Sequence, residues 1–330
     1  MSKLESWRVA VAAGLAIAAL AGTQVTAQGR FPSRPLQMII PFAAGGPTDI
    51  VGRIIGGKMG ELLGQTVVVE DRGGAGGTIG AAVVAKAAPD GYTMLMATVS
   101  TNAINPALYR HLPYNSETAF APIGRIGVTP TILMANVSLP TTDVKSLVAL
   151  IKANPGKYSY GSSGVGSILH LCGEEFKAAA GGLNMVHVPY KGSAPMDTDL
   201  LGGQISMAFD ATPTAMPLAL AGKVRALGAG MATRIPSMPN LPTLQEQGIK
   251  GYECYTWNAI IAPAGTPKPI VDKLNVTINK ALADPKVSDA LEKAGIDPTP
   301  GSTPNSTGQF IDAELKKWAP IIKESGARVD

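Results

Sequence analysis

One stretch, residues 36–64, most constrains what this chain can fold into, because a short apolar run leads through a glycine-containing loop into a helical pattern. Pro41 breaks the apolar run, and the loop occupies residues 42–48. Apolar residues from Ile50 onward then recur at the spacing of one helix face. The pattern predicts a buried strand that passes through a tight turn directly into an amphipathic helix.

The loop has the composition of an anion-binding site. Thr48 is the expected N-cap of the helix, with Asp49 in the first turn. Gly45 and Gly46 can adopt positive φ angles, so a ligand can approach backbone N–H groups at the positive end of the helix dipole. The loop lacks the lysine of a phosphate-binding loop, which favours a carboxylate over a triphosphate. A tight turn with no ligand is the alternative that this stretch alone leaves open.

The first 27 residues have the pattern of a secretory signal peptide. Lys3 and Arg8 precede an apolar run over residues 9–20, and small residues ending in Ala27 follow it. We expect cleavage after Ala27 and export of the mature chain. Because no other run of about 18 apolar residues follows, we expect no membrane-spanning helix.

Charge and cysteine content exclude several classes of function. The chain has 28 basic and 24 acidic residues and no basic run with interleaved aromatic residues, so we expect no nucleic-acid partner. The two cysteines lack the C-x-x-C spacing of a metal or redox site, and we expect no metal and no cofactor. Export permits a disulfide, but Cys172 falls in an expected helix and Cys254 in an expected strand. We therefore expect two buried thiols rather than a bridge.

The strand, turn and helix pattern recurs twice after the opening stretch. The glycine-rich loop 73–77 resembles a dinucleotide fingerprint, but Ile79 occupies the place of its third glycine. We expect this loop, Gly76 included, to pack a helix closely against the sheet and to line a cleft. A further strand ends in the polar segment 98–102. In parallel sheets ligands bind beyond the carboxyl ends of the strands, where these loops would meet.

A second α/β domain is expected to begin near Pro130, where the chain becomes extended and proline-rich. In it, the loop 162–167 repeats the opening motif of strand, glycine and hydroxyl loop, and helix. We expect the chain to return through an apolar strand near Trp257. The predicted division is residues 28–129 with 254–330 in one domain and 130–253 in the other. Two such loops in two domains predict one ligand held across a cleft.

A serine hydrolase is the alternative from another class of protein. It would use Ser162 or Ser163 with His170, but no acidic partner is evident. The spacing also does not match the G-x-S-x-G nucleophile elbow. We therefore favour binding without catalysis.

Several motifs in one order resemble a known family. They are P-F-A-A-G-G-P-T-D at 41–49, G-A-G-G at 74–77, P-D-G-Y-T at 89–93, V-P-Y-K-G at 188–192 and P-A-G-T-P at 263–267. Together they resemble the Bug receptors, the solute-binding subunits of tripartite tricarboxylate transporters. The chain has Asp-Arg-Gly-Gly at 71–74 where the family usually has Asn-Arg-Pro-Gly, so that wall of the site departs from the pattern.

The resemblance implies a two-lobed α/β fold of periplasmic-binding-protein type II (a Venus flytrap) with a ligand cleft between its domains. It also implies a periplasmic monomer that binds a small carboxylate without enzymatic activity and whose partners are the membrane subunits of a transporter. The anion-type loop in each lobe favours a dicarboxylate. A sensor kinase is the alternative partner. Dicarboxylates, acidic amino acids and aromatic acids all remain possible ligands. Combining the resemblance with the loops described above, the expected ligand-binding residues are Phe42, Ala43, Gly46, Thr48, Asp49, Gly76, Thr98, Asn102, Ser162, Ser163, Gly166, Ser167, His170, Tyr190 and Asp210.

Overall fold

The computed structural model describes residues 31–325 and 328–329, so the expected signal peptide and its cleavage site lie outside the described residues. The strands are β1 (Leu36–Ile40), β2 (Val67–Asp71), β3 (Thr93–Thr98), β4 (Phe120–Asn136), β5 (Ser159–Ser162), β6 (Val186–Pro189), β7 (Met207–Ala211), β8 (Val224–Ala229), β9 (Tyr255–Pro263) and β10 (Asp297–Pro298). The helices are α2 (Pro47–Leu63), α3 (Thr78–Ala85), α4 (Asn105–Leu108), α5 (Val144–Ala153), α6 (Ile168–Ala179), α7 (Ser193–Leu201), α8 (Thr212–Leu220), α9 (Lys268–Leu282), α10 (Pro285–Lys293) and α11 (Pro304–Ser325). Two short helical turns, η1 (Ala75–Gly77) and η2 (Ser100–Ile104), precede α3 and α4.

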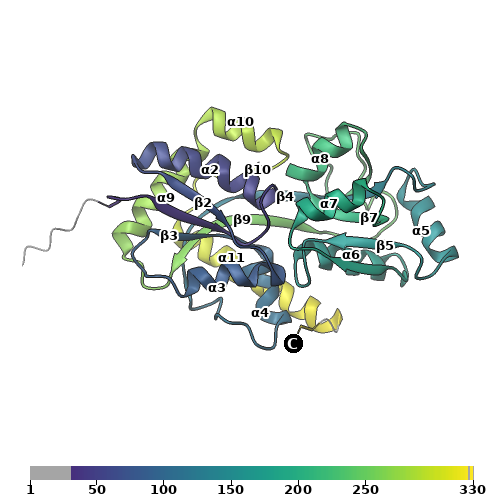
Figure 1. Cartoon of the computed structure of the whole chain (residues 1–330), viewed down its shortest axis with the longest axis horizontal. Helices are drawn as coiled ribbons and strands as arrows, with labels where there is room; N and C mark the ends of the chain where they lie inside the picture. The colour runs from purple at the N-terminus through teal and green to yellow at the C-terminus, as the bar shows by residue number, and fades with distance from the viewer. Residues whose placement is uncertain (1–30, 326–327, 330) are drawn as a thin grey trace, which may run out of the picture. The chain divides into compact units, whose positions relative to one another are not determined.

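The described strands join in the order β2-β1-β3-β9-β4-β7-β5-β6, with β8 and β10 also paired to β4 (Figure 1). As predicted, β1 pairs in parallel with both β2 and β3. The long strand β4 links two groups of strands. Its residues 120–130 pair with β9, and its residues 131–136 pair with β7 and β8.

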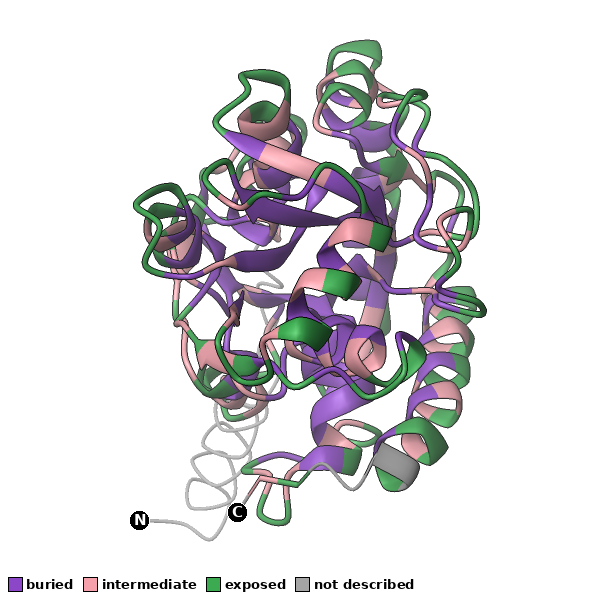
Figure 2. Cartoon of the chain, turned by 90° about the vertical axis from the view of Figure 1, so that its right-hand side faces the viewer, coloured by how far each residue is buried: buried purple, intermediate pink, exposed green. Residues whose placement is uncertain are grey.

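We call β1, β2, β3, β9, β10 and the first part of β4, with their helices, the first lobe. The second lobe comprises β5 to β8 and the end of β4, with α5 to α8. Both lobes combine strands and helices, so the prediction of a two-lobed α/β fold is confirmed. Figure 2 shows strands that are mostly buried and helices that expose one side.

Strand β1 explains why the opening stretch folds as it does. Leu36, Met38, Ile39 and Ile40 are all at most 1% exposed, and a strand that is apolar apart from Gln37 suits a parallel strand covered on both faces. On one side α2 packs so closely that a Cβ at Gly52 would lie 2.5 Å from the side chain of Ile40. The glycine therefore allows the helix to approach the strand.

The start of α2 differs from the prediction. Its N-cap is Gly46, and Thr48 lies inside the first turn without capping it. Pro47 takes the first helical position, where its fixed φ and missing N–H are both compatible with a helix. Gly45 has φ of +77°, whereas Gly46 is extended at −80°, so only the first glycine uses the left-handed region.

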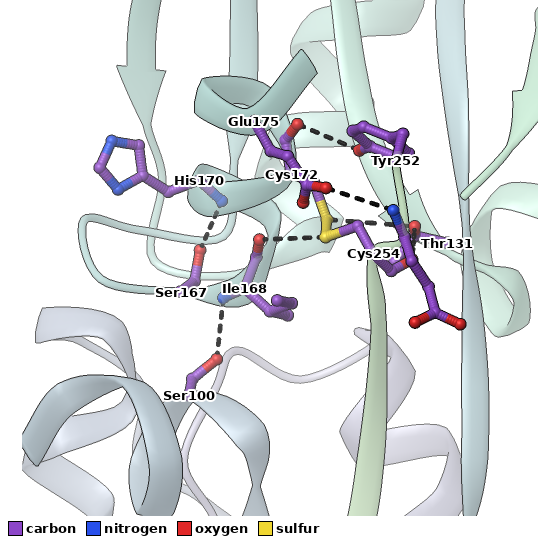
Figure 3. Close-up of a disulfide and its surroundings, with 10 residues drawn as sticks. Ser100, Thr131, Ser167, Ile168, His170, Cys172, Glu175, Tyr252 and Cys254 are labelled. Carbon is purple, nitrogen blue, oxygen red and sulfur yellow. Dashed lines mark hydrogen bonds between the residues drawn. A yellow bond between two sulfur atoms is a disulfide. The ribbon is translucent and has the colours of Figure 1, made fainter. Parts of the chain in front are cut away.

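The expectation of two free thiols was wrong, because Cys172 and Cys254 form a disulfide with a Cα–Cα distance of 5.6 Å (Figure 3). The two residues are 82 positions apart in sequence, and only the packing of α6 beside the segment that enters β9 brings them together. Hydrogen bonds support this junction. The Tyr252 hydroxyl donates to the Cys172 carbonyl at 3.0 Å, and the Thr131 hydroxyl donates to the Cys254 carbonyl at 2.6 Å.

Across the residues that the structure covers, none of the helices combines the length and the apolar character needed to span a bilayer. The same residues contain no cluster of His, Cys, Asp and Glu suited to a metal ion.

Candidate ligand-binding cleft

A small cavity lies where the two lobes meet. Its volume is about 30 Å³, close to the volume of roughly 30 Å³ that one water molecule takes up in the liquid. The residues lining it come from both lobes and are Phe42, Pro47, Thr48, Thr98, Ser100, Ser163, Ile168, Leu169, Ser193, Ala211 and Thr256. A ligand larger than water therefore enters only if the lobes separate.

The helices α2, α6, α7 and α8 all begin at this cavity. Pro47, Ile168 and Ser193 are the first residues of α2, α6 and α7, and Ala211 is the N-cap of α8. A helix N-terminus carries N–H groups that have no partner within the helix, together with a partial positive charge. Among the described residues, those that line the cavity include hydroxyl groups but no charged side chain. The cavity is therefore suited to a small anion.

The structure brings four of the sequence-predicted residues to the cavity. Phe42 and Thr48 come from the loop before α2, Thr98 ends β3, and Ser163 follows β5. Each is less than 9% exposed. This arrangement is consistent with the prediction that the loops 42–48 and 162–167 face one another.

Other predicted residues hold the lobes together rather than line the cavity. A Cβ on Gly76 would lie 2.6 Å from the carbonyl oxygen of Val165 in the opposite lobe. A Cβ on Gly166 would lie 2.9 Å from the Asn105 side chain, and the predicted Ala43 contacts Gly192, a residue not selected from the sequence, where a Cβ would lie 2.8 Å from the Ala43 nitrogen. Glycine is needed at these positions because the opposite lobe lies too close to leave room for a Cβ.

Three predicted polar residues do not line the cavity but form hydrogen bonds or ion pairs with residues close to them in the sequence. Asp49 accepts a hydrogen bond from the Gly45 N–H at 2.8 Å and pairs with Arg53 Nε at 2.7 Å, and this bond raises the pKa of Arg53. Asn102 accepts from the Thr101 hydroxyl at 2.8 Å. Ser167 is the N-cap of α6, accepting from the N–H of the residue three positions later at 3.3 Å. These residues shape the loops that surround the cavity.

The serine and histidine residues pair differently from the hydrolase alternative. Ser162 Oγ lies 2.7 Å from Nε2 of His187, a residue that the sequence analysis did not select. His187 stacks on His170 with ring centroids 4.1 Å apart, and burial lowers the pKa of His187 to about 4. Ser162 is 0% exposed and does not line the cavity. A nucleophile at this position would be inaccessible to a substrate in the cleft.

Tyr190 and Asp210 also lie outside the cavity lining. The Tyr190 hydroxyl donates to Asp199 Oδ2 at 2.7 Å, and burial raises the pKa of Tyr190 to about 12. Asp210 is fully buried behind Ser193 and accepts a hydrogen bond from the Ser193 hydroxyl.

Sequence reasoning missed the lining residues Pro47, Ser100, Ile168, Leu169, Ser193, Ala211 and Thr256. For Ser193 a signal existed, because Gly192 and Ser193 follow a strand and open a helix in the same way as the two selected loops. The Ser100 hydroxyl accepts from the Ile168 N–H at 3.0 Å across the lobe boundary (Figure 3). Only the fold shows that contact.

Two of the larger hollows lie away from this cavity. One of about 490 Å³ lies along α3, and one of about 700 Å³ lies between the loop 231–237 and α10. Neither includes a residue of the facing loops 42–48 and 162–167. The smaller cavity at the lobe boundary is therefore the candidate site.

The fold and the cavity together define a class of protein. Two α/β lobes joined through β4 and β9, with an anion-type cavity between them, are the architecture of a two-lobed solute-binding protein.

The comparisons with known proteins identify the family. The model of the tripartite tricarboxylate transporter family receptor matches residues 51–327, and the chain belongs to this family. The resemblance to the Bug receptors is thus confirmed.

Three solved structures illustrate the similarity. The periplasmic binding protein BugD is 39% identical with a TM-score of 0.87, and the match covers 90% of this chain and 99% of that one. A protein from R. palustris, solved with adipate, is 37% identical with a TM-score of 0.87, covering 91% and 100% of the two chains. MatC from Rhodopseudomonas palustris, with bound malate, is 31% identical with a TM-score of 0.85, covering 88% and 100%.

Proposed function

We propose that the mature chain is a periplasmic receptor that binds a small carboxylate, most readily a dicarboxylate, and delivers it to the membrane subunits of a tripartite tricarboxylate-type transporter. One observation carries the proposal, namely that α2, α6, α7 and α8 direct their N-termini at a cavity lined by hydroxyl groups and by no charged side chain among the residues described. A carboxylate bound there is stabilised by backbone N–H groups and helix dipoles.

The binding free energy expected from these contacts is compatible with a micromolar dissociation constant for a carboxylate. A micromolar dissociation constant corresponds to about −8 kcal/mol. A helix N-terminus contributes about 0.3 to 2 kcal/mol to binding an anion, and each charge-assisted hydrogen bond contributes about 1.5 to 3 kcal/mol. Several of these contacts exceed the required value, but ordering the ligand and the lobes costs several kcal/mol. Burial of the ligand between Phe42, Ile168 and Leu169 supplies further stabilisation.

Structural neighbours support the ligand class. One relative was solved with adipate and another with malate, and both ligands are dicarboxylates. The present cavity is smaller than either molecule. Binding therefore requires a more open arrangement of the lobes, followed by closure.

Closure provides the signal to the partner. We place the lobe boundaries at residues 28–129 with 254–330 and at 130–253, close to the change of pairing along β4 and to the start of β9. A ligand that touches both lobes stabilises the closed form. Membrane subunits of the transporter can then distinguish the closed monomer from the open one.

We infer that the receptor is not an enzyme. Of the two candidate serines, Ser162 is buried away from the cavity and pairs with His187, whereas Ser163 lines the cavity but hydrogen-bonds to no histidine among the described residues. A sensor kinase is the alternative recipient of the closed form, and a pull-down of membrane partners with the liganded protein separates it from a transporter.

A thermal-shift screen of the mature protein tests the ligand class. We expect a stabilisation of about 2.7 kcal/mol from a dicarboxylate at 100 times its dissociation constant, and smaller shifts from monocarboxylates. Ser163→Ala removes a lining hydroxyl and should reduce the shift, whereas Ser237→Ala, on an exposed loop, should not. If no class of carboxylate stabilised the protein, the proposal would be overturned.

A further inference from the structure

Ser193 is a cavity residue whose hydroxyl is bonded to a buried carboxyl group. It is 2% exposed, opens α7 and lines the cavity opposite the loop that precedes α2. Its hydroxyl donates to Asp210 Oδ1 at 2.5 Å. Asp210 lies on β7, beside α7 in Figure 1.

Asp210 is part of a buried carboxyl pair. Asp197 lies one helical turn beyond Ser193, close enough to Asp210 for the charge on one carboxyl to act on the other. Both carboxyls are buried, and burial together with mutual repulsion raises the pKa of Asp197 strongly. Burial also raises the pKa of Asp210, but hydrogen bonds to the anion oppose the rise. Two adjacent carboxyls of this kind share one proton near neutral pH.

The donors around the pair determine which carboxyl keeps the negative charge. Asp210 receives hydrogen bonds from the hydroxyls of Ser193 and Thr214. Asp197 has one carboxyl oxygen with no hydrogen-bond partner within the described part of the chain. The proton therefore belongs on Asp197, and Asp210 is the anion that accepts.

This arrangement fixes the direction of the Ser193 hydrogen bond. A serine hydroxyl has one hydrogen, and the Asp210 carboxylate, which can only accept, holds it. Ser193 lines the cavity, so a ligand atom that reaches its Oγ meets only lone pairs. A carboxylate oxygen of a ligand would meet another acceptor there, whereas a hydroxyl group of a ligand would find a partner.

We propose that Ser193, oriented by Asp210, is a specificity-determining residue that accepts a hydrogen bond from the ligand, so that the receptor prefers hydroxy-substituted dicarboxylates over unsubstituted ones. The inference rests on the proposed function and names the substrate class more closely. A hydroxyl fits better than an ammonium group because a buried ammonium needs several acceptors, and the described lining residues offer no carboxylate side chain.

Titration calorimetry of the purified mature protein at pH 7.5 tests the preference with two pairs of acids, succinate with malate and glutarate with 2-hydroxyglutarate. In each pair the hydroxy acid should bind about tenfold or more tightly, since the unsubstituted acid leaves the Ser193 acceptor without a donor. Equal affinities within both pairs would overturn the inference while leaving the carboxylate receptor intact. Binding of none of the four acids would instead count against the proposed function.

Variants then assign the preference to Ser193. In Ser193→Ala the ratio within each pair should fall to about twofold or less. In Asp210→Asn the new amide can donate to Ser193 Oγ and free its hydroxyl to donate into the cavity, so the ratio should fall to one or reverse. Thr198→Ala removes an exposed hydroxyl from the same helix and should leave the ratio unchanged. A tenfold ratio that persists in folded Ser193→Ala would exclude the assignment, whatever the folding of Asp210→Asn.

Discussion

Glu175 is a single residue that makes the stability of this fold depend on pH. It lies on α6 near the disulfide, and its Oε1 accepts from the Glu253 N–H at 3.2 Å (Figure 3). Burial raises the pKa of Glu175 to about 7, opposed by that hydrogen bond and by the positive charge of Lys317. The folded protein therefore binds a proton here more tightly than the unfolded chain does. This contribution to stability is complete below about pH 4.5 and is lost as the pH rises through about 7.

Glu175→Gln should remove this part of the pH dependence, because the amide keeps the acceptor oxygen but does not ionise. At pH 8 we expect the variant to be about 1 to 3 kcal/mol more stable than the parent protein, and at pH 4.5 about equally stable. Urea unfolding followed by circular dichroism across this range measures the difference. Glu117→Gln, at an exposed position, is the matched control. Parallel pH profiles for Glu175→Gln and the parent protein would show that Glu175 does not titrate as described.

Helix α6 links the candidate site to the rest of the molecule. Its first turn lines the cavity and contacts Ser100 of the first lobe, and its next turn carries Cys172. The disulfide then joins it to Cys254, immediately before β9. The helix whose N-terminus lies at the cavity is thus covalently tied to the segment where the chain crosses between the lobes.

Replacing both cysteines by alanine should lower the free energy of unfolding. The bridge closes a loop of 82 positions, for which loss of chain entropy in the unfolded state gives about 4.5 kcal/mol, with about 2 to 4 typical of native bridges. Denaturant unfolding under oxidising conditions measures the loss. Cys172→Ala alone should lose nearly as much as the double variant, because either change breaks the bridge. A double variant as stable as the parent protein would contradict this account.

The features of the whole fold that could be predicted from the sequence are those that short local patterns encode. Apolar runs and glycine turns indicated the strands, the parallel pairing of β1 and the two loops that face one another, and Phe42 and Ser163 indeed line the cavity. Contacts between distant segments left no local pattern. The pairing of Cys172 with Cys254 and the position of Thr256 depend on how β9 returns beside β4, which no short stretch encodes. Ser193 repeated a motif already recognised, so careful use of that motif would have found it.

The contact between the lobes leads to the last prediction. Gly76 has φ of +59°, and a Cβ there would meet the Val165 carbonyl oxygen of the second lobe at 2.6 Å. Gly76→Ala therefore adds two effects, a left-handed backbone cost of about 1 to 2 kcal/mol for a residue with a Cβ and a clash that exists only when the lobes close.

Gly64→Ala separates these effects, because Gly64 has φ of +67° and a Cβ there meets nothing within 4 Å. Both variants should lose similar stability without ligand, but only Gly76→Ala should bind the ligand at least about tenfold more weakly. X-ray scattering at saturating ligand should also give Gly76→Ala a larger radius of gyration than the parent protein. Equal ligand affinity in the two variants would mean that closure does not bring Gly76 against Val165. The lobe contact would then have no part in recognition.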